Sequence, residues 1–311
     1  MSSQPPPTDL PAEIFLLLRR AFFAADTSPL PYPLRDKGST QDDPFDEYVH
    51  RLLQEGLSPG VVCEKAPGQL ISPDLVVLRP DRCNNSSRES LASDLTSVVA
   101  VEVKKLERAA GTGKIARASG MDYNTTPPCG TVRVYDRSGQ PLDVRGFYLF
   151  VSQGLAAAAP RAYALSALVL CDGNILNEDF DLYLSIVGRR TKQIDLGTYG
   201  DGLNRQRPML VFSNPLGVTE LDRKVTLVHS RPDLEQQFSQ LRRVGMISRT
   251  PRQDADAPPN PAREFYCYRL RADVPTEHVE FALKDPFPKP QRSVETQGRG
   301  RFVLRSVSPS D

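Results

Sequence analysis

Residues 72–78 read SPDLVVL and residues 97–104 read SVVAVEVK, and these two stretches decide the fold class. Each is a run of β-branched and aliphatic residues next to a polar loop, which is typical of a strand buried on both faces of a sheet. Each run also carries an acid, Asp74 at the start of the first and Glu102 near the end of the second. If the two strands are neighbours, we expect their carboxylates to converge on one spot.

The second strand also carries a lysine beside the acid. Glu102 and Lys104 are two residues apart, so they point to one face of the strand, while Val101 and Val103 point to the other. The carboxylates of Asp74 and Glu102, the backbone carbonyl of Val103 and waters would form the oxygen-lined site that Mg²⁺ prefers. Lys104 could orient an attacking water, act on its proton or neutralise developing charge, and the sequence leaves these roles open.

The remaining chain is predicted to alternate between helices and strands. We expect helices over 11–25, 44–56 and 234–244, and further strands over 61–65, 131–135, 144–152, 209–212, 225–228 and 264–271. The predicted fold class is therefore α/β (α+β), with a central mixed β-sheet flanked by helices and additional β-rich elements in the second half.

Composition excludes several classes of protein. The chain has 311 residues, 39% hydrophobic and 25% charged, which is ordinary for a soluble globular protein. No apolar run approaches the roughly 18–20 residues that a membrane span requires, and residues 14–18 lack the flanks of a signal peptide. We therefore expect a cytoplasmic protein with no membrane partner.

Cysteine usage argues against a zinc site and against a disulfide framework. The 5 cysteines are scattered and odd in number, and none forms a C-x-x-C pair, so we expect buried or idle thiols. The net charge of +1 does not by itself indicate a nucleic-acid partner. A local basic groove can still be offset by acidic residues elsewhere.

The pattern Pro73–Asp74 followed by Glu102–Val103–Lys104 resembles the active-site signature of the PD-(D/E)XK nuclease superfamily. The resemblance covers the arrangement helix, strand, PD strand and ExK strand over residues 44–105, and residues 121–130 resemble type II restriction endonucleases. It implies a restriction-endonuclease-like fold, Mg²⁺ as cofactor and double-stranded DNA as substrate. It also implies catalytic roles for Asp74, Glu102 and Lys104.

Two features of the sequence compete with this interpretation. Pro80–Asp81, Pro232–Asp233 and residues 222–224 imitate parts of the signature, but they stand in the wrong position or order. Glu102 and Lys104 could also form a solvated face at a sheet edge, which is the usual meaning of charged alternation in a strand. Residues 98–103 are too continuously apolar for an edge strand, which favours the nuclease interpretation.

Many members of the superfamily add an acid from the helix that precedes the sheet. Asp46, Glu47 and Glu55 are the candidates on the predicted helix, and Glu64 is a further possibility on the first strand. Asp46 and Glu55 both flank the apolar face of the helix. Glu55 is the residue named as a fourth catalytic group.

DNA contacts are predicted in two loops. One follows Lys104 and is rich in glycine, so it could approach a phosphate backbone, and the other carries the side chains that read base edges. The residues predicted to contact DNA are Lys105, Lys114, Arg117, Asn204, Arg205 and Arg207. Residues 111–114 do not have the spacing of a P-loop, so no nucleotide cofactor is expected.

These expectations combine into one functional hypothesis. The sequence indicates a type II site-specific restriction endonuclease that acts as a homodimer on a symmetric target. A structure-specific repair or recombination nuclease of the same fold and a non-catalytic DNA-binding protein are the alternatives. We expect a disordered tail over 1–8, one domain over 9–285 and a weakly structured tail over 286–311. The catalytic core would span about 44–170 and the DNA-recognition elements about 171–285.

Overall fold

The computed structural model describes residues 8–38, 43–68, 71–107, 130–156, 162–176, 198–199, 208–210, 215–250, 261–286, 292–295 and 303–307. Most of the predicted N-terminal tail and much of the predicted C-terminal tail therefore lie outside the described residues. The described helices include none that is long and apolar enough to cross a membrane.

Two longer helices precede the sheet, as the sequence predicts. Helix α1 spans Leu10–Phe22 and helix α2 spans Pro44–Gly56. Each begins after an aspartate whose side chain accepts a backbone N–H of the first turn, at 3.1 Å for Asp9 and 3.0 Å for Asp43. Each also has proline in its first turn, where the missing N–H is harmless.

Among the described residues, the strands form one twelve-stranded mixed sheet and one two-stranded sheet. The main path runs β13 (Phe281–Lys284), β11 (Leu241–Arg249), β12 (Arg263–Leu270), β10 (Val225–His229), β7 (Ala162–Asp172), β6 (Pro141–Leu155), β4 (Val98–Glu107), β3 (Leu75–Leu78) and β2 (Val62–Lys65). Off this path, β1 (Tyr32–Pro33) pairs with β7, and β5 (Thr131–Tyr135) pairs with β6 and β8 (Thr198–Tyr199). The small sheet joins β9 (Pro208–Leu210) to β14 (Arg292–Glu295).

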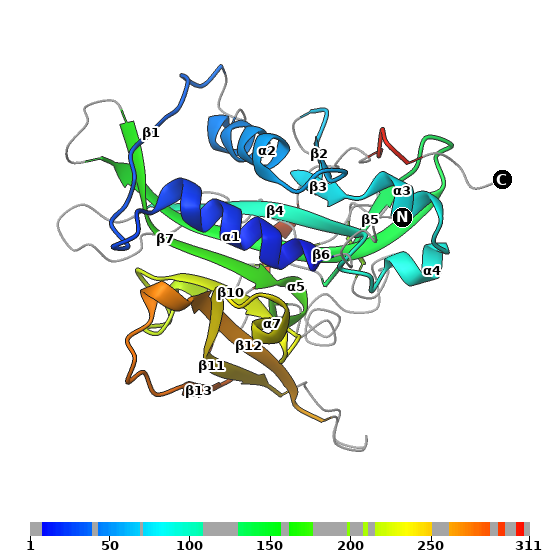
Figure 1. Cartoon of the computed structure of the whole chain (residues 1–311). Helices are drawn as coiled ribbons and strands as arrows, with labels where there is room; N and C mark the ends of the chain where they lie inside the picture. Colours follow the sequence, from blue (N-terminus) through cyan, green and yellow to red (C-terminus); the bar gives the residue numbers. More distant parts are fainter. Residues whose placement is uncertain are drawn as a thin grey trace, which may run out of the picture.

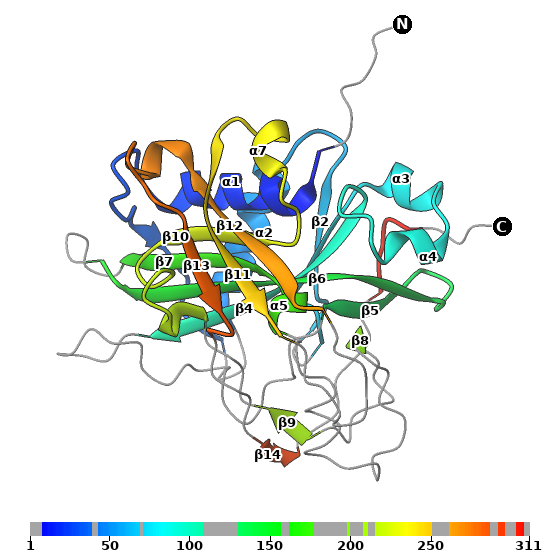
Figure 2. The same cartoon turned by 90° about the horizontal axis from the view of Figure 1, so that it is seen from below.

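The main sheet joins the two halves of the chain. Strands β4 and β6 are parallel, as are β7 and β10, whereas β2, β3 and β4 form an antiparallel meander. The pairing of β10 with β7 makes the C-terminal strands a continuation of the N-terminal sheet (Figures 1 and 2). The predicted class, a central mixed sheet with flanking helices, is confirmed at this level.

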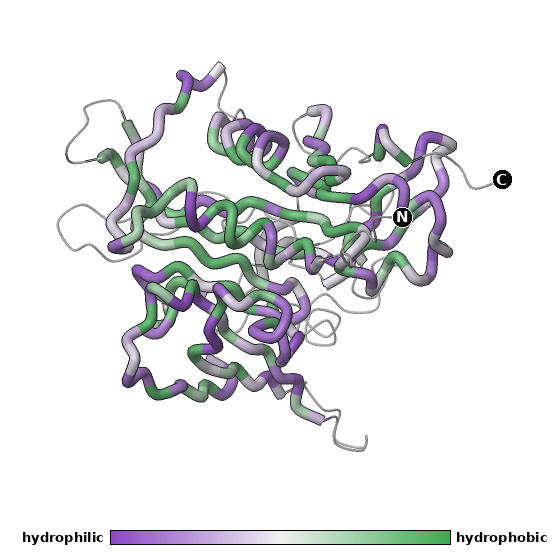
Figure 3. Tube along the Cα trace, viewed as in Figure 1, coloured by the Kyte–Doolittle hydropathy of each residue, from purple (hydrophilic) through white to green (hydrophobic). Residues whose placement is uncertain are grey.

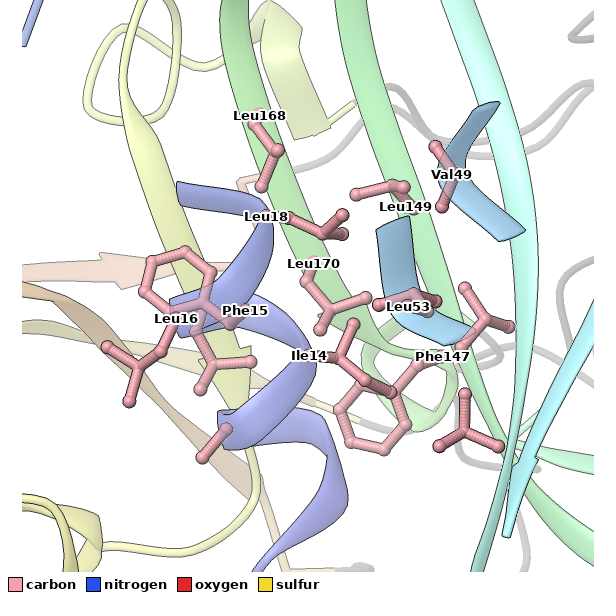
Figure 4. Packing of buried hydrophobic residues seen from close by; sticks show 14 of the residues in the cluster. Ile14, Phe15, Leu16, Leu18, Val49, Leu53, Phe147, Leu149, Leu168 and Leu170 are labelled. Atoms are coloured by element: carbon pink, nitrogen blue, oxygen red, sulfur yellow. The ribbon is translucent and has the colours of Figure 1, made fainter. Parts of the chain in front are cut away.

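Helices α1 and α2 cover one face of the sheet, where the largest apolar cluster lies (Figure 1). Figure 4 shows Ile14 and Leu18 of α1 and Leu53 of α2 directed toward Leu149 and Leu170 of the strands, and all five are fully buried. The central strands are correspondingly hydrophobic along their length (Figure 3). Burying each such side chain stabilises the fold by roughly 1.5–3 kcal/mol.

Short helices and turns pack against the opposite face. They are α3 (Pro80–Asn84), α4 (Arg88–Leu91), α5 (Gly173–Leu176) and the 3₁₀ turn η1 (Pro215–Gly217), all of which contribute buried side chains. Residues 303–307 also lie here: Leu304 and Val307 are buried among strands β3 to β6. The sequence places these residues in a weakly structured tail, but Leu304 and Val307 belong to the core.

The helix predicted over 234–244 is wrong in its second half. Only Leu234–Gln237 is helical (α7), and the chain then turns into strand β11, which pairs with β12 along its whole length. The buried residues Leu241, Val244 and Ile247 have a spacing that also suits a helix. Pairing with two neighbouring strands, β12 and β13, overrides that local preference.

Candidate active site

The candidate site lies where strand β4 extends beyond the start of strand β3. The two strands pair antiparallel, with Leu75 opposite Val101, so Asp74 comes just before β3 and stands opposite Glu102. At this point β4 has no β3 residue to pair with, and the Asp74 Oδ2 atom accepts the backbone N–H of Val103 at 2.7 Å. The two acids expected to converge are thus held by neighbouring strands.

Glu102 and Lys104 form an ion pair inside the protein. Lys104 Nζ donates to Glu102 Oε1 at 2.8 Å, and both residues are only 6% exposed. Ser72, which precedes the PD pair, donates its hydroxyl to the same carboxylate at 3.0 Å. Serine and lysine together fix the orientation of the Glu102 carboxylate.

The Glu102–Lys104 ion pair is buried among apolar side chains, which is unusual for charged residues. Glu102 and Lys104 lie on the face of β4 opposite α1 and α2, between Ala100 and Leu106, which belong to two apolar clusters. Burying two charges costs several kcal/mol per ion before their attraction is counted. β4 is also an interior strand, between β3 and β6. The alternative of a solvated charged edge is therefore wrong.

Helix α2 adds a third acid, and it is Asp46. Burial raises the pKa of Asp46 well above its usual value, and the nearby carboxylates of Asp74 and Asp43 raise it further, while Lys105 and Lys104 act against this. The charges of Asp74 and Lys104 thus both act on the Asp46 carboxylate. Neighbouring carboxylates repel each other, and a bound cation would relieve that repulsion.

Glu55, the helix acid named from the sequence, does not belong to this site. It is exposed, and it lies nine residues after Asp46, or about 13 Å farther along the helix axis. The two acids flank the apolar face on opposite sides of the helix, and only the first turn of α2 comes near the start of β3. Glu64 is also elsewhere, because its carboxylate accepts the backbone N–H groups of Arg305 and Ser306.

Lys105 is engaged within the protein. Its Nζ atom donates to both carboxylate oxygens of Asp43 at 2.6 Å, and its side chain is 10% exposed. The alternation along β4 places Lys105 on the helix-covered face, where it meets the residue that caps α2. It therefore anchors α2 to β4, and its expected DNA contact stays a prediction. The other predicted DNA contacts, Lys114, Arg117, Asn204, Arg205 and Arg207, lie outside the described residues.

The donor chemistry of the site suits a hard divalent cation. The carboxylates of Asp74, Glu102 and Asp46 and the backbone carbonyl of Val103 are all oxygen donors, and Mg²⁺ binds through such oxygens. Within the described ranges, no three His, Cys, Asp or Glu side chains already converge on one metal position. Ser72, Lys104 and the Val103 N–H occupy oxygens of the two strand acids. Ion binding would have to rearrange some of these contacts.

Four of the five cysteines lie within the described ranges, and none of these four belongs to the candidate site. Cys63, Cys83, Cys171 and Cys267 are free and buried, which agrees with the expectation of buried or idle thiols. Burial raises the pKa of Cys63, Cys83 and Cys267 to about 12 each, so these thiols stay protonated at neutral pH.

Comparisons of the chain with protein-family models, with curated proteins and with solved structures found no match. The functional conclusion accordingly depends on the geometry of the site and on the sequence pattern that predicts it.

Proposed function

We propose that this protein is a Mg²⁺-dependent endonuclease that hydrolyses phosphodiester bonds of double-stranded DNA. One observation carries the proposal: a buried Glu102–Lys104 ion pair lies beside Asp74, where β4 extends beyond the start of β3. Burying charged side chains weakens the fold, because they lose their hydration. Such residues are therefore found mostly at functional sites, where their chemistry is needed. Two acids, Asp74 and Glu102, and one lysine, Lys104, are the side chains that metal-assisted hydrolysis of a phosphodiester requires.

Each residue has a definite part in the proposed reaction. Asp74 and Glu102 would hold the cation, together with the carbonyl of Val103, and Asp46 adds negative charge from α2. The bound ion would polarise the scissile phosphate and lower the pKa of the attacking water. Lys104 presents an ammonium group, oriented by Glu102, that can position the water or balance charge on the phosphate.

The finer form of the proposal is a type II restriction endonuclease. Its support is the sequence: the loop with Asn204, Arg205 and Arg207 has the side chains that read adenine and guanine edges. A symmetric DNA target would require a homodimer with one active site in each subunit. Such an enzyme would act in the cytoplasm.

The decisive experiment is cleavage of a supercoiled plasmid by the full chain with Mg²⁺ or with EDTA. Asp74→Asn keeps an acceptor for the Val103 N–H but removes the charge, and Lys104→Met keeps the apolar part of the side chain. We expect discrete bands that require Mg²⁺, and a loss of at least about 100-fold in rate for each variant. Glu55→Gln is the matched control and should cut like the unmodified protein.

The other results of this assay would redirect the proposal. A smear, or cutting restricted to branched substrates, would support the repair or recombination alternative. Retained activity in both Asp74→Asn and Lys104→Met would refute the assigned site. DNA affinity measured by fluorescence anisotropy should remain within about twofold for Lys104→Met, because that residue is assigned to chemistry and not to docking.

A further inference from the structure

A cavity lies at the C-terminal end of α1, and it shares no residue with the candidate active site. Its volume is about 770 Å³, and it opens where Phe23 at the end of α1, the turn before β10, and strands β7, β12 and β13 meet. Ligand sites in proteins usually have volumes of about 300–1,000 Å³ and mostly apolar walls with a few convergent polar groups. This cavity has that composition.

The apolar walls come from both ends of the chain. Phe23 and Pro29 contribute from the segment after α1, and Pro275 and Phe281 contribute from the segment that leads into β13. Arg19 holds these two segments together, because its guanidinium makes two 2.6 Å bonds to the Asp273 carboxylate and one to the Phe23 carbonyl. The walls are thus fixed by a buried ion pair.

The charged groups of the cavity are predominantly cationic. Arg269 lies in the wall, where its Nε donates to the Thr226 hydroxyl at 3.0 Å and its Nη2 donates to the Glu220 carbonyl. Both acceptors are neutral, and no carboxylate pairs with Arg269 in the described part of the chain. Burial lowers the pKa of Arg269, and the neighbouring Asp273 carboxylate, which acts in the opposite direction, does not cancel this effect. Lys224 adds a second cation at the rim.

The acids of the cavity do not cancel this charge. Asp273 is already paired with Arg19, at 2.6 Å. Glu220 also lines the cavity, together with the cationic residues Lys224 and Arg269. An anion that enters would therefore meet more positive than negative charge, close to a partly desolvated guanidinium.

The backbone around the cavity is strained in two places. Among the described residues, three that are not glycine have positive φ, and two of them, Thr27 at 68° and Arg223 at 53°, line this cavity. A β-branched residue such as threonine rarely adopts this conformation. Strained residues of this kind collect at ligand sites, where the surrounding structure holds them in place.

We propose that this cavity binds a small organic anion, with its carboxylate or phosphate at Arg269 and Lys224 and its apolar or aromatic body against Phe23 and Phe281. The inference does not depend on nuclease activity. It rests on the volume, the apolar walls, the cation without a carboxylate partner and the two strained residues.

The test is isothermal titration calorimetry of the full chain with two matched pairs of probes. The first pair is benzoate and benzyl alcohol, and the second is adenosine 5′-monophosphate and adenosine. We expect at least one anion to bind, and to bind at least about tenfold tighter than its neutral partner, because a charge-assisted hydrogen bond to the guanidinium is lost in the neutral compound. The pair that responds identifies the carboxylate or the phosphate as the preferred head group.

Variants locate the binding. Lys224→Ala changes an exposed side chain, and the glutamine in Arg269→Gln can still donate to Thr226, so both variants should fold. Each substitution should lower the affinity for the anion by about tenfold. Lys284→Ala, an exposed lysine of β13 that does not line the cavity, should bind as the unmodified chain does. Equal binding of the anion and its neutral partner in both pairs, or unchanged affinity in both Lys224→Ala and Arg269→Gln, would overturn the proposal.

Discussion

Burial and neighbouring charge decide what each acidic residue can do in this protein. Asp46 and Glu55 lie on the same helix and both flank its apolar face, yet the charges of Asp74 and Lys104 act on Asp46, whereas Glu55 is exposed. The sequence signal that could have selected Asp46 is its position in the first turn, directly after the cap Asp43. That cap is bound to Lys105 of β4, so the first turn of α2 is the part fixed beside the strand acids.

The pair Asp46→Asn and Glu55→Gln tests this difference between two acids of one helix. We expect Asp46→Asn to reduce Mg²⁺-dependent plasmid cleavage by about tenfold to 100-fold, because it removes negative charge beside the proposed cation site. Glu55→Gln should leave the rate within about twofold. Equal rates for the two variants, measured at saturating and at limiting Mg²⁺, would remove Asp46 from the site.

Turns between strands are stabilised by side chains that imitate backbone acceptors. The connection from β5 to β6 begins at Asp136. Its carboxylate accepts the backbone N–H groups of Ser138 and Gln140, each at 2.9 Å, and a hydrogen bond from the Arg88 guanidinium. Residues 136–139 read DRSG, which is typical of such a turn. Burial alone would raise the pKa of Asp136, but the bonds from Arg88, Ser138 and Gln140 outweigh it and lower the pKa to about 2.

The lowered pKa predicts how stability depends on pH at this element. Because the carboxylate is preferred in the folded state, its contribution is complete above the unfolded pKa of 3.8 and is lost as the pH falls toward about 2. Asp136→Asn should lower the free energy of unfolding by about 1–3 kcal/mol at pH 7, and the difference should shrink steadily below pH 4. Urea unfolding at pH 7 and pH 3 measures both values.

Asp26 supplies a matched control for this turn. Its carboxylate accepts the backbone N–H of Ser28 at 3.0 Å and the Ser28 hydroxyl at 2.6 Å, as Asp136 does with Ser138, but it is exposed. Asp26→Asn should therefore change stability less than Asp136→Asn. An equal effect at the two positions would show that burial and Arg88 add nothing to the turn.

The whole molecule is closed by contacts between the two ends of the chain. Glu64 of β2 is 8% exposed and accepts the backbone N–H groups of Arg305 at 2.6 Å and Ser306 at 2.8 Å, more than 200 residues away in sequence. Leu304 and Val307 are buried beside it. Arg19 and Asp273 make a comparable link between α1 and the 3₁₀ turn η2 (Arg271–Asp273).

Removing the Glu64 carboxylate should weaken the attachment of residues 303–307 to strand β2. Glu64→Ala leaves two backbone donors without their acceptor, so we expect the free energy of unfolding to fall by about 2–4 kcal/mol. Equilibrium urea unfolding measures the change, and limited proteolysis should show earlier cleavage near residues 303–307. Glu55→Ala, an exposed acid, is the control and should change stability by less than about 0.5 kcal/mol. Resistance to protease equal to that of the unmodified chain would contradict the proposed role.

The sequence by itself determined the buried strands around Asp74 and Glu102, the shared face of Glu102 and Lys104, and both long helices, because these depend on local alternation and capping. Only the tertiary structure decided that Asp46 and not Glu55 lies by the strand acids, that Lys105 binds Asp43, and that residues 241–249 form a strand. Such outcomes depend on which surfaces meet across distant elements. The packing free energy that favours these contacts comes from many pairs of residues far apart in the chain. It therefore cannot be predicted from the sequence of any one segment.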